Sequence, residues 1–246
     1  MDSGGINNLN TLMKRLEAVT SRIEDAATFW EQNSKAANQL KVEAFRELGD
    51  GKVDLNPRQP PALPLPAAIE SFDRIIKEEV GDLIKCGAQI GGPVEQQAKA
   101  FKRAFEAERT FLLVASKAKQ PNPMPPEMTA ELEHCIAVVI ETQGANRASP
   151  LFFHLSAVSE GVLALSWIVQ KRPIDFVKDV FAAAQYFGNK VLNEYKHKDT
   201  THVEFIHAYY NIFRSLTIYV REYFAFGLTW NGKDAIDARE ALKLLS

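Results

Sequence analysis

The sequence predicts an all-α protein: an antiparallel six-helix bundle that follows a short N-terminal coiled-coil segment and a proline-rich linker. Two observations support this fold class. Apolar residues recur at intervals of three and four through most of the chain, as in an amphipathic helix, and no run alternates like a half-buried strand. Short connections rich in glycine or proline separate these runs, so successive helices are expected to lie antiparallel.

The composition is that of an ordinary soluble protein. Its 246 residues are 46% hydrophobic and 24% charged, the net charge is −2, and no long run of lysine or arginine occurs. This charge balance argues against a nucleic-acid partner. The N-terminus, MDSGGINNLN, lacks the pattern of a signal peptide, and the apolar run 155–169 is interrupted by serines and Glu160. We therefore expect a cytoplasmic protein that is not inserted in a membrane.

The first helical segment, residues 9–24, carries a heptad-like seam. Its apolar residues are spaced by three and four positions: Leu9, Leu12, Leu16, Val19 and Ile23. A similar tripeptide occurs twice, as Arg15-Leu16-Glu17 and Arg22-Ile23-Glu24, and the interval of seven residues places both copies on one helix face. So short a helix is not stable alone in water, so the seam needs a partner. Self-association is the first interpretation, and docking on its own domain is the alternative.

The next part of the chain divides the protein into regions. Residues 25–48 are compatible with a helix of looser pattern, whereas residues 49–66 contain five prolines and two glycines. Proline fixes φ and lacks a backbone donor, so this stretch is expected to be an extended linker. The predicted regions are an oligomerisation segment (1–48), a proline-rich linker (49–66), a helical folded domain (67–230) and a C-terminal tail (231–246).

Six helices are expected in the folded domain, and local signals mark where they start and stop. Gly91-Gly92-Pro93 separates the first two helices, and the PNPMPP segment at 121–126 ends the second. Ser149-Pro150 suits the start of the fourth helix, and Asp199 or Thr200 suits the cap of the sixth. The expected helices are 67–89, 94–119, 127–143, 150–170, 173–196 and 200–226. The tail is expected to form at most a weak terminal helix that is mobile or loosely packed.

No motif of the sequence indicates catalysis. The five histidines have neither the HExxH pattern nor the spacing of a helical metal pair, and no serine lies in a GxSxG nucleophile elbow. The IGGP segment at 90–93 precedes a helix but lacks the GK[ST] of a P-loop. His154, on an otherwise apolar helix, is interpreted as a hydrogen-bonded packing residue. We therefore expect a protein that is not an enzyme and that needs no metal or cofactor.

Five strings of the sequence resemble the N-terminal region of the cyclase-associated protein family. They are MKRLEAVTSRIE (13–24), IGGPVEQQAKAF (90–101), SPLFFHLSAVSEGVLALSW (149–167), FGNKVLNEYKHKDTTHVEFIHAYYNIF (187–213) and GLTWNG (227–232). The resemblance implies a six-helix bundle that binds cofilin-decorated actin at the pointed end of a filament. It also implies that this binding speeds depolymerisation of the filament.

The resemblance assigns a separate role to the first helix, as a coiled coil that oligomerises and contacts adenylyl cyclase in fungi. That role falls on the two tripeptides, whose residues are Arg15, Leu16, Glu17, Arg22, Ile23 and Glu24. An actin-regulatory module acting with cofilin at the cytoplasmic actin cytoskeleton is the main interpretation. A signalling scaffold that binds adenylyl cyclase through this helix is the alternative.

Polar residues at helix ends and in loops are the candidate contacts of the bundle with actin and cofilin, because binding residues concentrate there. One exposed face suffices for such a module, with charges setting the register of the complex. The candidates are Arg147 in the 144–149 loop and, around the end of the fifth helix, Asn189, Lys190, Glu194, Lys196 and Lys198. For each of them, an ordinary solvated surface residue is the alternative.

Overall fold

The structure is a computed structural model that describes residues 66–232 and 234–245. Within these residues every regular element is helical, and the β-bridge between Ala118 and Ile236 is isolated. The elements are α2 (Ala67–Ile75), η1 (Ile76–Val80), α3 (Gly81–Ile90), α4 (Gly92–Lys117), η2 (Pro126–Met128), α5 (Ala130–Ala145), α6 (Phe152–Gly161), η3 (Val162–Val169), α7 (Pro173–Tyr195), α8 (Thr200–Tyr223) and α9 (Ala238–Leu245). The predicted all-α class is confirmed.

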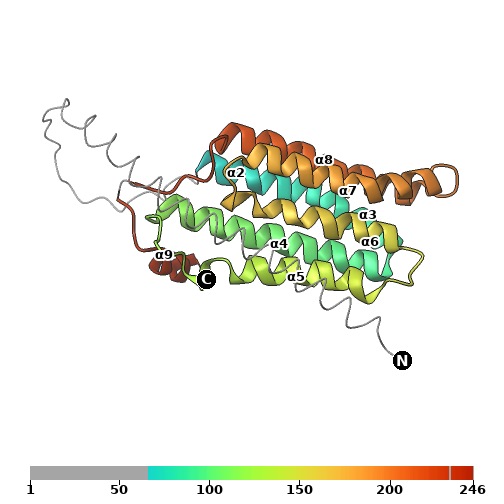
Figure 1. The fold of residues 1–246 in the computed structure, drawn as a ribbon, viewed down its shortest axis with the longest axis horizontal. Coiled ribbons are helices and arrows are strands. Elements are labelled where there is room, and N and C mark those ends of the chain that lie inside the picture. The colour runs from blue at the N-terminus through green and yellow to red at the C-terminus, as the bar shows by residue number, and fades with distance from the viewer. Residues whose placement is uncertain (1–65, 233, 246) are drawn as a thin grey trace, which may run out of the picture. The chain divides into compact units, whose positions relative to one another are not determined.

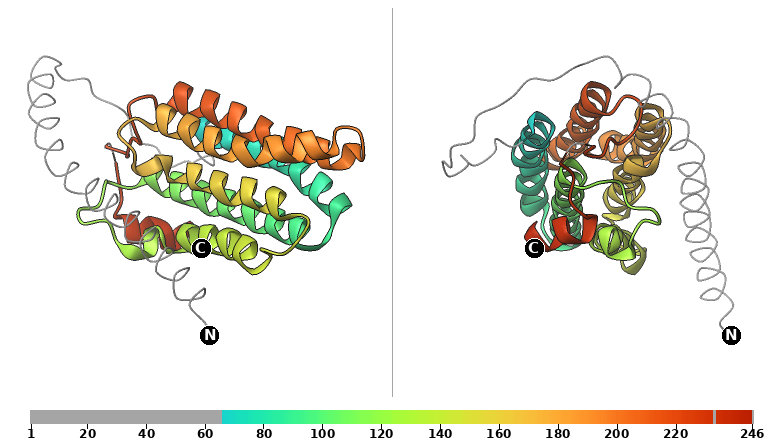
Figure 2. Two further views of the ribbon diagram at one scale, coloured as in Figure 1. Left: turned by 45° about the vertical axis from the view of Figure 1, so that its right-hand side comes forward. Right: turned by 90° about the vertical axis from the view of Figure 1, so that its left-hand side faces the viewer.

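Six antiparallel helices form the bundle, in the order that the sequence predicts (Figures 1 and 2). The π-helical turn η1 joins α2 to α3 in one continuous helix, and α6 continues directly into the 3-10 segment η3. The long helices α7 and α8 run beside one another, and α6 lies between α7 and α4 (Figure 1). The α2–α3 helix packs against α4 and α8, α5 packs against α4, and α6 packs against α7.

The predicted coiled-coil segment and most of the predicted linker lie outside the described residues. The same holds for the six candidate residues of the two N-terminal tripeptides, at 15–17 and 22–24. The predicted division of the chain at residues 48 and 66 therefore stays a prediction.

Aromatic side chains fill the centre of the bundle. Its largest fully buried aromatic residues are Trp167, Tyr209, Tyr219, Phe72, Phe101, Phe105, Phe205 and Phe213. Phe72 stacks on Phe105 with the ring centroids 5.7 Å apart, and Phe101 meets Tyr209 edge to face at 5.7 Å. Pairs of this geometry add to the free energy gained by burying the rings. Most aromatic residues of α8 therefore build the core rather than an exposed surface.

A buried glutamine ties three helices together. Gln97 of α4 is 1% exposed, and its Nε2 donates to the backbone carbonyls of Val139 at 2.9 Å and Leu155 at 3.0 Å. A buried amide requires partners, and these two acceptors belong to α5 and α6. Gln97 thereby fixes the positions of both helices relative to α4.

Two glycines make room for tyrosine side chains of α8 against α6 and α7. A Cβ at Gly161 would collide with the hydroxyl of Tyr209, and a Cβ at Gly188 would collide with the hydroxyl of Tyr210. The Tyr209 hydroxyl donates to a backbone carbonyl of α6 at 2.9 Å, and the Tyr210 hydroxyl donates to Asn189 Oδ1 at 3.1 Å. Glycine inside a helix costs about 1 kcal/mol relative to alanine. These close contacts explain why glycine occupies both positions.

The stretch Phe152–Val169 is long and apolar enough to cross a membrane by length and composition. The serines and Glu160 within the overlapping run 155–169 predict the opposite. The stretch forms α6 and η3, and 61% of it is buried inside the bundle. Burial in a protein core accounts for its apolar character, so the stretch is weak evidence for a membrane span.

The chain after α8 returns to the end of α4. The backbone N–H of Asn231 donates to the carbonyls of Ala115 and Ala118, at 3.0 and 3.1 Å, and that of Ile236 donates to the carbonyl of Lys117 at 3.2 Å. The last carbonyls of a helix have no donor within the helix itself. The tail supplies these missing donors, which is why it is ordered against the bundle.

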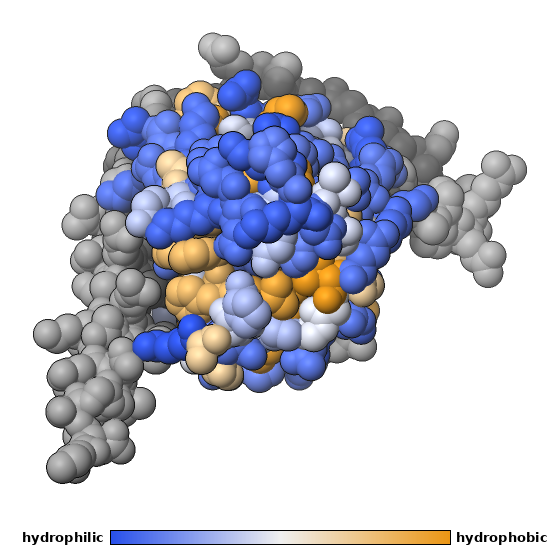
Figure 3. Space-filling model, turned by 90° about the vertical axis from the view of Figure 1, so that its right-hand side faces the viewer, coloured by the Kyte–Doolittle hydropathy of each residue, from blue (hydrophilic) through white to orange (hydrophobic). Residues whose placement is uncertain are grey.

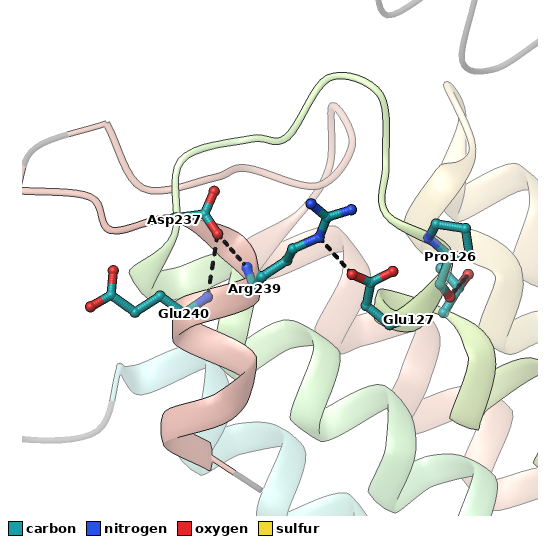
Figure 4. Close-up of polar contacts among 6 residues, drawn as sticks. Pro126, Glu127, Asp237, Arg239 and Glu240 are labelled. Atoms are coloured by element: carbon teal, nitrogen blue, oxygen red, sulfur yellow. Dashed lines mark hydrogen bonds and ion pairs between the residues drawn. The ribbon is translucent and has the colours of Figure 1, made fainter.

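Helix α9 packs on the bundle more closely than the sequence predicts. Asp237 caps it, because its Oδ1 accepts from the backbone N–H of Arg239 at 2.8 Å (Figure 4). The helix buries Ala238 and Ala241, and Arg239 pairs with Glu127 at 2.6 Å. The expectation of a mobile or loosely packed tail is therefore corrected. The packing of the tail could not be predicted from its own sequence, because its partners, the α4 carbonyls and Glu127, come from distant parts of the chain.

Glu108 places a carboxyl group in the core of the bundle. The residue is fully buried, and neither carboxyl oxygen has a hydrogen-bond partner among the described residues. The indole N–H of Trp167 and the hydroxyl of Tyr219 are also buried there without partners. Burial raises the pKa of Glu108 well above its usual value, and the Trp167 indole N–H, which lies near the carboxyl without reaching hydrogen-bond geometry, opposes part of this rise. The folded protein therefore favours the neutral acid at this position.

Replacing Glu108 with glutamine should flatten the dependence of stability on pH. Because the folded-state pKa is raised, the folded protein keeps a proton that the unfolded chain releases above its own pKa. The contribution of Glu108 to stability is thus greatest below the unfolded pKa and is lost as pH rises, by up to about 1.4 kcal/mol per pH unit. Glutamine cannot ionise, so the unfolding free energy of Glu108→Gln, measured in urea from pH 5 to 8, should rise relative to that of the wild type as pH increases.

The matched control for this measurement is Glu106→Gln, which removes an exposed carboxylate from the same helix. Its pH profile should follow that of the wild type. A Glu108→Gln profile that also follows the wild type would show that Glu108 does not bind a proton on folding.

Candidate protein-binding surface

Three connections meet at one end of the bundle, on the right-hand side of Figure 1. They are the α3–α4 turn at Gly91, the α5–α6 loop at 146–151 and the α7–α8 loop at 196–199. An antiparallel bundle brings alternate connections to the same end, so distant parts of the sequence become neighbours there. All six candidate residues of the bundle lie in two of these loops or in the last two turns of α7.

Lys190 is held by three aromatic rings from two helices. Its Nζ lies 4.4 Å from the ring centroid of Tyr186, 4.8 Å from that of Phe153 and 5.9 Å from that of Phe187. A cation is attracted to the face of an aromatic ring at such distances. Phe153 belongs to α6 and the other two rings to α7, so these contacts fix Lys190 at the seam between the helices.

Asn189 and Glu194 both have partners within the bundle. Asn189 Oδ1 accepts the hydrogen bond of Tyr210, which joins α7 to α8. Glu194 pairs with Lys198 at 3.7 Å, and Lys198 Nζ also lies 5.8 Å from the ring centroid of Tyr195. An exposed ion pair adds little stability, so a partner protein can break it at low cost. Asn189 has a structural contact, whereas Glu194 and Lys198 stay accessible to a partner.

Arg147 and Lys196 are the least constrained of the candidates. Both are exposed, and neither forms an ion pair with a residue in the described ranges. Arg147 lies in the α5–α6 loop and Lys196 in the α7–α8 loop. With Lys190 and Lys198 they place four cationic side chains at this end, which favours approach by an acidic surface.

The surface of this end combines hydrophilic and hydrophobic parts (Figure 3). Hydrophilic side chains cover most of it, and a hydrophobic band crosses it. Partly exposed apolar residues beside the connections include Ile90, which ends α3, and Leu151, which precedes α6. An apolar centre with a polar rim is typical of a protein–protein interface. We call this end the bundle-end surface; its charged candidates are Arg147, Lys190, Glu194, Lys196 and Lys198.

A histidine pair lies behind the α7–α8 loop and supports it. His154 Nε2 of α6 lies 2.8 Å from His202 Nδ1 of α8, so one imidazole donates a hydrogen bond to the other. Tyr195, the last residue of α7, stacks on His202 with the ring centroids 3.9 Å apart. His154 also meets the Tyr195 ring edge to face, with the ring centroids 5.4 Å apart. Three helices that carry the bundle-end surface are thus joined at one point.

Asp199 connects this pair to the start of α8. Its Oδ1 accepts from the backbone N–H of Thr201 at 2.9 Å, so it is the N-cap that the sequence proposed with Thr200 as its alternative. Its Oδ2 lies 3.8 Å from His202 Nε2. This backbone hydrogen bond is the largest of the effects that lower the pKa of Asp199. The lowered pKa keeps the capping carboxylate ionised.

Both histidines favour the neutral form. Burial lowers the pKa of His154 to about 4, and the neighbouring His202 adds to this effect. Burial also lowers the pKa of His202, although the charges of Asp199 and Glu194 oppose the change. The hydrogen bond between the rings requires one neutral acceptor nitrogen, so protonating both rings would break it.

The residues around Lys190 and the histidine pair were not predicted as groups. His154 and His202 are 48 residues apart, and only the packing of α6 on α8 brings them together. The interpretation of His154 as a hydrogen-bonded packing residue agrees with the structure. Around Lys190, the spacing of Tyr186 was a readable signal, because residues four apart are neighbours on a helix. The ring of Phe153 could not be found this way, because it comes from another helix.

Among the described residues, no group of three or more histidine, cysteine, aspartate or glutamate side chains is placed to hold an ion. What the bundle-end surface offers is exposed charge beside apolar area, which suits recognition of a protein.

Acidification should destabilise the protein through His154. Its folded-state pKa is lowered, so the unfolded chain binds more protons than the folded protein between about 6.5 and about 4. The contribution of His154 to stability is therefore fully present above this window and is lost as pH falls, by about 2 kcal/mol between pH 7 and pH 5. His154→Phe keeps a ring but cannot titrate, so urea unfolding should show a smaller loss between these two pH values.

His207→Phe makes the same substitution at an exposed position of α8 and serves as the control. It should lose as much stability on acidification as the wild type. If His154→Phe also loses that amount, His154 is not the group that senses acid.

Comparisons of sequence with known proteins agree with the geometry. The chain matches the family described as "CAP, N-terminal domain" over residues 72–228, and the one described as "CAP N-terminal conserved motif" over residues 10–67. Adenylyl cyclase-associated protein 2 of Homo sapiens is 34% identical, over 91% of this chain and 44% of its own length. Adenylyl cyclase-associated protein 1 of Homo sapiens is 36% identical, over 66% of this chain and 35% of its own length.

Solved structures share the fold. The N-terminal domain of the adenylyl cyclase-associated protein from Dictyostelium discoideum has a TM-score of 0.67 at 28% identity, over 70% of this chain and 98% of its own. A second structure, of the N-terminal domain of CAP and described as indicating variable oligomerisation, has a TM-score of 0.68 at 28% identity, over 70% of this chain and 94% of its own. This chain spans less than half the length of the curated relatives it matches. By sequence and by fold, it belongs to the cyclase-associated protein family and carries the N-terminal region of that family.

Proposed function

We propose that this chain is an actin-binding regulatory module that promotes cofilin-dependent disassembly of actin filaments at the pointed end. Membership of the cyclase-associated protein family supports a regulatory role, and we assign no enzymatic activity and no cofactor to the chain. The observation that carries the proposal is the bundle-end surface, where exposed cations and an apolar band occupy the same end of the bundle. In this proposal the partners are actin and cofilin, and the place of action is the cytoplasmic actin cytoskeleton.

Such a module can act by binding alone. A ligand shifts an equilibrium only by the difference between its affinities for the two states. The bundle must therefore bind an actin subunit in its detaching geometry more tightly than one held inside the filament. The bundle-end surface suits this task because Gln97, the two tyrosine hydroxyls of α8 and the histidine pair hold its helices in fixed positions.

Self-association would strengthen this action. Linked copies raise the effective concentration of the second bundle once the first has bound a filament. A proline-rich linker of the composition seen at 49–66 is semi-rigid and extended, so it would let several bundles reach separate actin subunits. One solved relative is described as showing variable oligomerisation, which supports assembly as a property to test here.

A second candidate function is a signalling scaffold that binds adenylyl cyclase. The match to the N-terminal conserved motif covers residues 10–67 and includes both tripeptides, at 15–17 and 22–24. The curated relatives are named for an association with adenylyl cyclase. In this proposal the N-terminal helix is the binding part, and the bundle serves as a spacer.

Depolymerisation of pyrene-labelled actin in the presence of cofilin tests the main proposal. The full chain should raise the rate of pointed-end depolymerisation above the rate with cofilin alone. The double variant Arg147→Glu, Lys196→Glu should lower this effect several-fold, because both cations face solvent at the bundle-end surface. Its thermal unfolding temperature should stay near the wild-type value, since exposed substitutions change stability little.

Arg221→Glu reverses an exposed charge near the other end of α8 and is the control, which should act as the wild type does. A wild-type rate equal to that of cofilin alone would refute the main proposal. An unfolded double variant would instead make Arg147 and Lys196 structural residues.

Light scattering tests self-association through the N-terminal seam. Leu16→Asp combined with Ile23→Asp places two charges on the apolar face, so the measured mass should fall to that of a single chain. Thr20→Asp places a charge outside the seam and should leave the mass as in the wild type. A double variant with the wild-type mass would contradict the coiled-coil prediction.

A further inference from the structure

Lys190 forms no ion pair with a glutamate on its own helix, unlike two lysines of α4. Lys99 pairs with Glu95 at 2.6 Å and Lys102 pairs with Glu106 at 3.0 Å, each four residues apart on α4. Glu194 occupies the equivalent position relative to Lys190. It pairs instead with Lys198, and no carboxylate in the described ranges lies within ion-pair distance of Lys190.

The rings around Lys190 hold its charge in place at the surface. Lysine has a flexible stem of four carbons, and ordering such a side chain normally weakens binding. Here Tyr186 and Phe153 lie within 5 Å of Nζ on two different helices, so the ammonium is positioned before any partner arrives. A cation that is ordered in advance and has no carboxylate partner is ready to bind an external anion.

Exposed aromatic surface adjoins this cation. Tyr186 is 61% exposed, although most aromatic residues of the bundle are buried, and Phe153 and Phe187 are partly exposed beside it. Tyrosine at an interface supplies a large contact area at a small entropic cost, and it is frequent among residues that dominate binding energy. The ammonium group of Lys190 and the exposed ring of Tyr186 are thus available side by side to a partner.

We propose that Phe153, Tyr186, Phe187 and Lys190 form a docking patch for an acidic segment of a partner protein, in which a carboxylate stands next to an apolar side chain. The carboxylate pairs with Lys190, and the apolar side chain packs on the exposed ring of Tyr186. We call this set the α6–α7 patch. That the partner of this patch is the cofilin-decorated actin filament rests on the proposed function.

Charge complementarity selects a carboxylate partner over a nucleic acid. The patch holds a single cation, and Glu194 lies one helical turn further along α7. A polyphosphate backbone needs several cations in a row and would be repelled by that carboxylate. A single carboxylate beside an apolar side chain needs only one cation, and it can bind Lys190 without extending toward Glu194.

Cosedimentation of the full chain with cofilin-decorated actin filaments tests the patch. Lys190→Met keeps the unbranched stem among the rings but removes the charge, so binding should weaken about tenfold, as for the loss of one charge-assisted contact. Raising the salt concentration should narrow the difference from the wild type, because salt screens the contribution of the wild-type charge. Lys190→Arg keeps a cation over the rings and should restore most of the binding. Tyr186→Ala should weaken binding several-fold at all salt concentrations.

Lys178→Met is the matched control, since Lys178 is an exposed lysine three turns earlier on the same helix. It should bind as the wild type does. Wild-type binding that Lys190→Met leaves unchanged would overturn the patch but spare the proposed function, whereas a wild type that does not cosediment would overturn both. If Lys190→Met changes the oligomer mass in light scattering and not filament binding, a second copy of this chain occupies the patch and the proposal is wrong.

Discussion

The fit of two α8 tyrosine side chains against glycines of α6 and α7 is the constraint on which the rest of the bundle depends. It is possible because Gly161 and Gly188 have no Cβ atoms where the hydroxyls of Tyr209 and Tyr210 lie. Both hydroxyls donate hydrogen bonds across the helix interfaces, so the contact fixes orientation as well as distance. With these three helices in place, the rings around Lys190 and the histidine pair form at their seams. The surface chemistry of the bundle end therefore follows from a contact in the core.

Buried polar groups in this bundle are of two kinds. Gln97 and the tyrosine hydroxyls of α8 have partners on other helices, so they specify how the helices pack. Glu108 and His154 are buried titratable groups and His202 is a partly buried one, and burial pushes each toward its neutral form. Because a buried carboxyl and a buried imidazole shift in opposite directions, one weakens the fold as pH rises and the other weakens it as pH falls.

The helices of the folded domain were predictable because their signals are local. The expected helix 173–196 is observed as Pro173–Tyr195, and the expected helix 200–226 as Thr200–Tyr223. Proline in a first turn, aspartate at a cap and apolar spacing each act within a few residues. The packed tail was not predictable, because the chain before α9 is held by the carbonyls at the end of α4 and α9 itself by Glu127, all more than 100 residues earlier.

The sequence by itself determined the all-α class, the order of the six helices of the bundle, the N-cap at Asp199 or Thr200, and the strings that resemble one family. Only the tertiary structure decided which candidate residues share a surface and in what state. It showed Asn189 bound to Tyr210, Lys190 held by rings, and Arg147 exposed without an ion pair. The physical reason is the separation along the chain of the residues that interact. Helix formation depends on neighbours three or four positions away, whereas the availability of a side chain to a partner depends on contacts between helices far apart in the chain.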